Sequence, residues 1–154
     1  MYSFAIVQIC LVFFGAVSVF GLCTIKPIDG VVKIPVGTTS IEANAFYDCE
    51  ELTVVIMHKR VTKVEYNAFD DAKNLETVIF EKGSLLTEIG DYAFRGCTSL
   101  KTITIPPGIE TLGWDAFKNT GCDENTFIPG RIVFGCIYYT GETGTKTLRK
   151  KGRD

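Results

Sequence analysis

The side chains of this chain that could do chemistry are six cysteines, one histidine and several adjacent acidic residues. The cysteines occupy positions 10, 23, 49, 97, 122 and 136, and none of their spacings matches a paired Cys-x-x-Cys metal site. Cys122 and Cys136 are separated by 13 residues at the point where the regular part of the sequence ends. We therefore expect these two thiols to form a disulfide that closes a C-terminal cap over residues 130–145.

The histidine and the acidic residues do not form a recognisable catalytic set. His58 is the single histidine and lies in the turn "MHKR", and the chain contains no G-x-S-x-G, H-E-x-x-H or glycine-rich phosphate loop. We expect the pairs Glu50-Glu51 and Asp70-Asp71 to lie on a solvated outer turn, because they do not converge on one point. The sequence therefore predicts a protein that is not an enzyme and holds no metal or cofactor.

Charge is distributed unevenly along the chain. Residues 29–124 contain 16 acidic and 9 basic residues, whereas residues 130–154 contain 2 acidic and 6 basic residues. A nucleic-acid-binding protein would carry its positive charge on a folded face, so this distribution predicts no nucleic-acid partner. The basic segment 146–154 is polar, and we expect a solvated, disordered tail there.

The first 22 residues are almost entirely apolar, and the first charged residue is Lys26. Such a run at the N-terminus predicts a secretory signal peptide over residues 1–22, with cleavage after Gly21 or after Cys23. The run is also close to the roughly 20 residues of a membrane-spanning helix, so an uncleaved anchor is the alternative. The sequence thus predicts a secreted or cell-surface protein, which contacts a membrane only if the segment is retained.

A repeated unit fills the middle of the chain and fixes its fold. The dipeptide Ala-Phe ends at residues 46, 69, 94 and 117, in steps of 23, 25 and 23. An apolar residue lies five positions before each Phe, and a leucine lies six positions after the first three. Stacked units would place each Phe on a Phe and each Leu on a Leu, so these residues are predicted to be structural. They are Phe46, Phe69, Phe94, Phe117, Leu52, Leu75 and Leu100.

Each unit also contains a short β-branched run, at residues 31–35, 53–57, 76–80 and 101–106, and a partial fifth unit begins at residues 125–129. These runs predict parallel strands, and the Ala-Phe segments predict short helical turns. Cys49 and Cys97 hold equivalent positions two units apart, which is roughly 10 Å at the spacing of neighbouring strands. A disulfide cannot span that distance, so we expect both to be small buried side chains.

The stretch "LKTITIPPGIETLGWDAFKNTGC" resembles the BspA-like leucine-rich repeat, in register over about residues 31–128. Gly90 and Gly113 match the glycine of that pattern, whereas Glu42 and Glu65 depart from it, and Ala72 and Thr120 replace its cysteine. The resemblance implies an α/β solenoid with strands on the concave face and helical turns opposite. It also implies a secreted or surface protein, since several members resemble adhesins. We expect this repeat domain, four repeats and a partial fifth, over residues 23–129.

Side chains alternate across a strand, so every second residue of each β-branched run should point away from the core. Two outward columns result, and the concave surface that they form is the predicted binding site for a protein ligand. The columns are Val31, Val54, Thr77, Thr102 and Asn125, and Lys33, Ile56, Ile79, Thr104 and Phe127. The alternative is a structural segment without a ligand, which would self-associate through its open ends.

Overall fold

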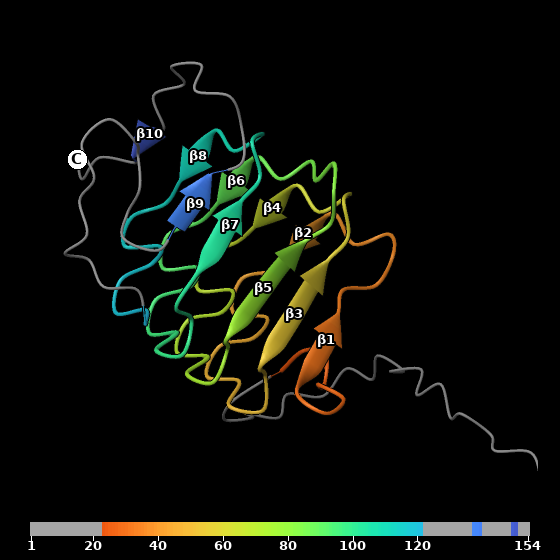
Figure 1. Ribbon diagram of the computed structural model, residues 1–154, viewed down its shortest axis with the longest axis vertical. Coiled ribbons are helices and arrows are strands. Elements are labelled where there is room, and N and C mark those ends of the chain that lie inside the picture. Colours follow the sequence, from red (N-terminus) through yellow and green to blue (C-terminus); the bar gives the residue numbers. More distant parts are fainter. Residues whose placement is uncertain (1–22, 122–136, 140–148, 151–154) are drawn as a thin grey trace, which may run out of the picture.

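The computed structural model describes residues 23–121, 137–139 and 149–150. These residues form ten strands and no helix, and the chain is a parallel β-solenoid of about four turns (Figure 1). The α/β prediction is therefore wrong in its helical half. The strands are β1 (Val31–Lys33), β2 (Ser40–Ile41), β3 (Val54–Met57), β4 (Lys63–Val64), β5 (Thr77–Phe80), β6 (Glu88–Ile89), β7 (Ile103–Ile105), β8 (Thr111–Leu112), β9 (Ile137–Tyr139) and β10 (Arg149–Lys150).

Each turn contributes one longer and one shorter strand to the stack. The longer strands form the sheet β1-β3-β5 and the pair β7-β9, and β7 lies beside β5 (Figure 1). The shorter strands form a second sheet in the order β10-β8-β6-β4-β2. This second sheet was not expected from the sequence, because two-residue strands are too short for an alternation pattern to develop.

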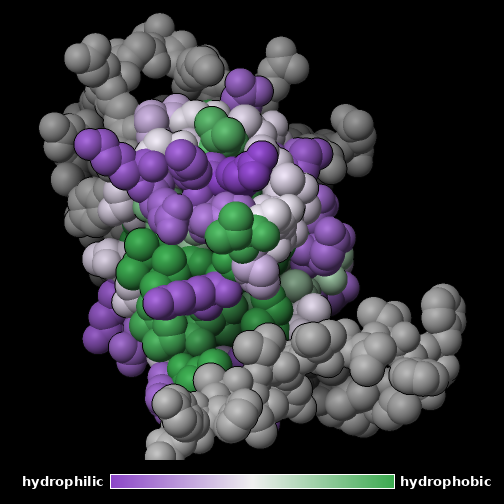
Figure 2. All heavy atoms as spheres, turned by 90° about the vertical axis from the view of Figure 1, so that its right-hand side faces the viewer, coloured by the Kyte–Doolittle hydropathy of each residue, from purple (hydrophilic) through white to green (hydrophobic). Residues whose placement is uncertain are grey.

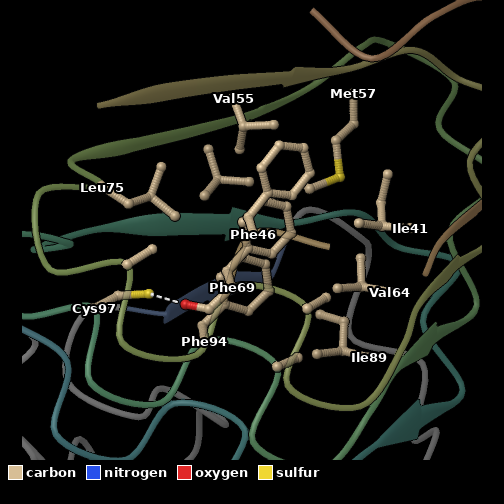
Figure 3. Packing of buried hydrophobic residues seen from close by; sticks show 14 of the residues in the cluster. Ile41, Phe46, Val55, Met57, Val64, Phe69, Leu75, Ile89, Phe94 and Cys97 are labelled. Carbon is tan, nitrogen blue, oxygen red and sulfur yellow. Dashed lines mark hydrogen bonds between the residues drawn. The ribbon is translucent and has the colours of Figure 1, made fainter. Parts of the chain in front are cut away.

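The core lies between the two sheets and is closed on its third side by the Ala-Phe segments. The rings of Phe46, Phe69, Phe94 and Phe117 stack almost parallel, with centroids 5.0, 5.0 and 5.3 Å apart along the column. Figure 3 shows the first three of these rings. The first three rings are at most 1% exposed, and Phe117 is only partly buried. Leu52, Leu75 and Leu100 are fully buried beside them. The exact recurrence in the sequence thus corresponds to one continuous column of core contacts.

The Ala-Phe segment does not form a helix because residues with a left-handed backbone conformation interrupt it on both sides of the Phe. Residues two before and two after each Phe have positive φ, for example Asn67 at 53° and Asp71 at 56°. Asn, Asp and Gly tolerate this left-handed conformation best, which explains their recurrence at these positions. The eight residues are Asn44, Asp48, Asn67, Asp71, Tyr92, Gly96, Asp115 and Asn119.

This backbone conformation gives every turn two sets of backbone hydrogen bonds. The N–H groups of Asn67, Phe69 and Asp71 donate to carbonyls of the next turn, at 3.1, 2.8 and 2.8 Å. The N–H groups between them donate within the turn, as Asp70 does to the Asn67 carbonyl at 3.1 Å. The segment therefore satisfies its buried backbone by joining neighbouring turns, which a helical turn could not do.

Candidate ligand-binding face

The outward columns of the predicted binding face are present in the first sheet. Val31 is paired in register with Val54, and Val54 with Thr77. Lys33 is paired with Ile56, and Ile56 with Ile79. The residues between them, Val32, Val55 and Val78, are at most 8% exposed and face the core. The strands therefore present two aligned columns of side chains on the side away from the core, and we call these residues the sheet face.

The sheet face is largely uncharged and β-branched. Ile79 is 43% exposed at its centre, and Ile56 beside it is half-buried. Lys33, at the outermost strand, is the only charged member of the two columns in the described part of the chain. Thr104 in β7 and Thr102 just before it are exposed and extend the columns. This surface can contact a ligand through apolar side chains, threonine hydroxyls and one ammonium group.

The strand that pairs with β7 in the sheet is not the one that the sequence predicts. The sequence places Phe127 beside Thr104, but β7 pairs with β9, and Thr104 is opposite Tyr138. Asn125 and Phe127 lie outside the described residues. The place of Asn125 and Phe127 in the binding face therefore stays a prediction.

The cysteine that we expected to be free at position 49 forms a disulfide with Cys23, and the Cα atoms are 5.3 Å apart. Cys122 and Cys136, the predicted pair, lie outside the described residues. The Thr24 N–H donates to the Ala45 carbonyl just as each Phe N–H donates to the Ala of the next turn, so Thr24 holds the Phe position of a preceding turn and Cys23 lies one residue before it. The distance argument compared Cys49 with Cys97 only, and it missed the cysteine one turn away, at the separation that a disulfide needs.

Cys97 shows why this pairing is geometrically natural. Its Sγ lies 3.1 Å from the carbonyl oxygen of Phe69, which belongs to the preceding turn, and donates a hydrogen bond to it. A cysteine three residues after a Phe thus points at the preceding turn, beside its Phe position. For Cys49 that turn contains Cys23, whereas for Cys97 it contains no cysteine. Cys97 therefore stays a buried thiol, and burial raises its pKa, which keeps the thiolate scarce.

Asp70 is buried, although we expected it on a solvated turn. Its side chain is fully buried and accepts two hydrogen bonds from the Arg95 guanidinium, one of them from Nε at 2.8 Å. Arg95 also lies over the ring of Tyr92, with Cζ 4.5 Å from the centroid. The hydrogen bonds to Asp70 hold the pKa of Arg95 above its ordinary value. This pair joins two neighbouring turns. Lys118 follows the next Phe of the column, as Arg95 does, but it pairs with Asp115 of its own turn.

His58 has a structural role instead of a catalytic one. Its ring is 7% exposed, and Nδ1 accepts a hydrogen bond from the Arg60 N–H at 3.2 Å. Nε2 lies 2.9 Å from the Pro35 carbonyl oxygen and therefore donates to it. The imidazole thus connects the turn after β3 with the turn after β1. Within the described ranges, no three His, Cys, Asp or Glu side chains lie close enough to hold a metal ion.

Within residues 23–121, 137–139 and 149–150, no helix is long and apolar enough to cross a membrane.

Three solved structures are similar to this chain. A leucine-rich repeat protein of T. pallidum is 30% identical with a TM-score of 0.53, over 57% of this chain and 42% of that one. One from Bacteroides capillosus is 23% identical with a TM-score of 0.57, over 73% and 78%. A leucine-rich cell surface protein of Faecalibacterium prausnitzii is 25% identical with a TM-score of 0.43, over 75% and 33%. The chain thus spans less than half of the T. pallidum protein, and the second likeness supports the fold alone.

No curated protein matches the chain significantly. The model of the BspA type leucine-rich repeat region matches residues 18–134 in six copies, which is most of the chain. The match begins upstream of the first expected repeat, in agreement with a preceding turn in which Thr24 holds the Phe position. The period, the stacked Phe column and this match all identify the same repeat, and the chain belongs to the BspA type leucine-rich repeat family.

Proposed function

We propose that this chain is a non-enzymatic recognition module of a secreted or cell-surface protein, and that it binds a protein ligand on the sheet face. The observation that carries the proposal is the exposure of Ile79, which is 43% exposed in β5, in register with Ile56 of β3 and on the strand that lies beside β7. An exposed apolar side chain on a sheet favours contact with a partner. The disulfide between Cys23 and Cys49 supports an oxidising compartment, and therefore export of the protein.

The chemistry of the face favours an extended or flat protein surface as the ligand. The columns have a regular spacing, so a partner can place side chains between neighbouring turns. Thr77, Thr102 and Thr104 offer hydroxyl groups that donate or accept hydrogen bonds without the desolvation cost of a charge. Lys33 is exposed at one edge and favours an acidic residue of the partner nearby.

Crosslinking of the exported protein to the surface of cells or matrix that bear the ligand tests the proposal. The comparison uses Ile79→Glu, Ile56→Glu and, as a control, Leu85→Glu, whose residue is 58% exposed on a turn outside the columns. The two sheet-face variants should lose saturable crosslinking, because a carboxylate in an apolar contact is desolvated without a partner. The control should crosslink like the unsubstituted protein. Equal crosslinking by all four proteins would show that the ligand does not bind at the sheet face.

A further inference from the structure

The two most exposed large hydrophobic side chains of the described residues both lie in the first turn. Ile28 is 78% and Val36 is 85% exposed, while Ile25 and Val31 of the same turn are half-buried. Figure 2 views this side of the molecule and shows hydrophobic side chains gathered in one area among hydrophilic ones. We call these four residues the end face. The terminal turn of a solenoid normally needs a polar outer surface to stay soluble, so this apolar end indicates a contact.

The backbone at this end is also incompletely paired. β1 is the outermost strand of the first sheet, and β2 is the outermost strand of the second. Ile28 and Val31 exchange two hydrogen bonds of 3.0 and 2.9 Å, which occupy the outward N–H and C=O groups of Val31. The outward groups of Lys33, two residues further along the strand, have no partner among the described residues. An edge of this kind is a template for another strand.

The unpaired backbone at Lys33 helps to decide whether a membrane or another protein chain covers the end face. A lipid bilayer would accept Ile28 and Val36, but it offers no groups to pair with backbone at a strand edge. A strand of another protein chain satisfies both the apolar and the hydrogen-bonding requirements. The exposed charges of this turn, Lys26, Asp29 and Lys33, have both signs. A surface with charges of both signs can face its own copy, whereas a surface of one sign would repel it.

We propose that the end face binds the end face of a second copy of this chain, so that the two solenoids meet at their N-terminal ends about a two-fold axis. Such an isologous contact closes after two copies and pairs the outward backbone groups of Lys33 in one copy with those of Lys33 in the other, in antiparallel orientation. The contact shares Val31 and Lys33 with the sheet face, and it leaves Ile56 and Ile79 accessible, so it does not depend on the ligand.

Sedimentation of the exported full-length protein over a wide range of concentration tests the contact. The unsubstituted protein should change from monomer to dimer as its concentration rises. Ile28→Glu and Val36→Glu should each weaken the dimer at least about tenfold, equivalent to roughly 1.4 kcal/mol. Leu85→Glu, an exposed leucine in the turn after β5, should dimerise normally. A protein that stays monomeric at every concentration, or an equal effect of the control, would overturn the proposal.

Two further measurements distinguish a second copy of the chain from a membrane surface as the partner of the end face. Under mild oxidation Lys33→Cys should give a covalent dimer, because the two-fold axis brings both β1 edges together, while Lys101→Cys should stay monomeric. Equal crosslinking of both variants would contradict the geometry. Flotation with vesicles of phosphatidylcholine and phosphatidylglycerol measures lipid binding of the same proteins. Lipid binding that Ile28→Glu abolishes, in a protein that sediments as a monomer, would replace the second copy by a membrane surface and overturn the proposal.

Discussion

Cys23 is bonded to Cys49 of the next turn, and it lies one residue before the position that a Phe holds in each later turn. The link also aligns the segment before the first strand with the stack, because the Thr24 N–H donates to the Ala45 carbonyl at 2.8 Å. This donation mimics the one from Phe46 to Ala68 in the next turn, at 2.7 Å. The N-terminal segment therefore behaves as an abbreviated turn of the solenoid.

Removal of this disulfide should destabilise the protein without changing the stacked turns. Closure of a loop of this size contributes on the order of 3 kcal/mol in the chain-entropy model. Cys49→Ala should therefore lower the midpoint of urea unfolding, and the reduced unsubstituted protein should behave in the same way. Urea titrations of the two proteins, with and without reductant, measure the effect. If reductant lowers the midpoint of Cys49→Ala as much as that of the unsubstituted protein, the stabilising bond lies elsewhere.

Processing of the chain should leave Cys23 in the mature protein. Cleavage after Cys23 would remove one half of the disulfide and turn the Thr24 amide into a charged terminus beside Ala45. Of the two cleavage points that the sequence offers, the one after Gly21 keeps both interactions. Mass spectrometry of the exported, unreduced protein should therefore find a peptide containing Cys23 linked to one containing Cys49. An N-terminus at Thr24 would show that this bond does not form in the exported chain.

The buried thiol of Cys97 should resist modification until the protein unfolds. Burial raises the pKa of this thiol, so the reactive thiolate is scarce at neutral pH. The thiol also donates a hydrogen bond to the Phe69 carbonyl. Alkylation with iodoacetamide at pH 8 should leave Cys97 unlabelled in buffer and label it in denaturant. Rapid labelling of the folded protein would mean that this part of the stack opens readily.

Arg95 should stabilise the protein by holding the charge of Asp70. Arg95→Leu leaves a buried carboxylate without its partner, which should cost about 3 kcal/mol, the lower end for such pairs because the arginine is partly exposed. Adding Asp70→Asn removes the charge and should recover much of this loss. Chemical unfolding of the two single variants and the double variant gives the coupling free energy. Additive effects, with no recovery in the double variant, would show that the ion pair adds nothing beyond packing.

Gly113 should be intolerant of any side chain because two backbones meet there. A Cβ at this position would lie 2.2 Å from backbone atoms of Gly90 and Asp91 in the preceding turn. Gly113→Ala should therefore force neighbouring turns apart and lower the melting temperature strongly. Gly83→Ala is the matched control, since φ is 78° there but nothing lies within 4 Å. Its cost should be limited to the roughly 1–2 kcal/mol of a left-handed backbone.

The Phe column should be most sensitive at its centre. Phe69 contacts a ring on each side and is fully buried, so Phe69→Ala should cost about 3–5 kcal/mol. Phe117 stacks on Phe94 alone among the described residues and is only partly buried, so Phe117→Ala should cost less. Urea unfolding of both variants gives the comparison. An equal loss at both positions would contradict a column of independent ring contacts.

The sequence predicts the columns of this solenoid well because a regular stack translates every position by one period. The Phe contacts and the register of Val31, Val54 and Thr77 follow from the offsets alone. The helical turns were mispredicted because an Ala-Phe pair favours helix locally, while the left-handed residues on either side make that impossible. Asn67 and Asp71 carried this signal, since both residue types tolerate positive φ, but a single sequence does not distinguish that use from an ordinary turn.

Features that break the period were harder to predict. Asp70 looked solvated because it lies between Phe69 and Leu75 on the expected outer turn, and its burial depends on Arg95, which lies 25 residues further along the chain. The sequence contained a signal for the Cys23–Cys49 disulfide, because about one period counted backward from Phe46 places Cys23 in the turn next to Cys49. The binding role of the sheet face remains a prediction, because exposure of Ile79 says where a partner can dock and not which partner docks.

The Cys23–Cys49 link gives the solenoid a preferred direction of mechanical failure. Each turn touches only its neighbours, so a stretched solenoid releases turns one after another from an end. The disulfide locks residues 23–49 into a closed loop, and a pulling force applied to the two chain ends cannot extend that loop. Force spectroscopy should therefore record unravelling that starts from the C-terminal side and a contour length short of the full chain. A protein attached through its N-terminal side would keep its anchored turn intact while the distal turns yield.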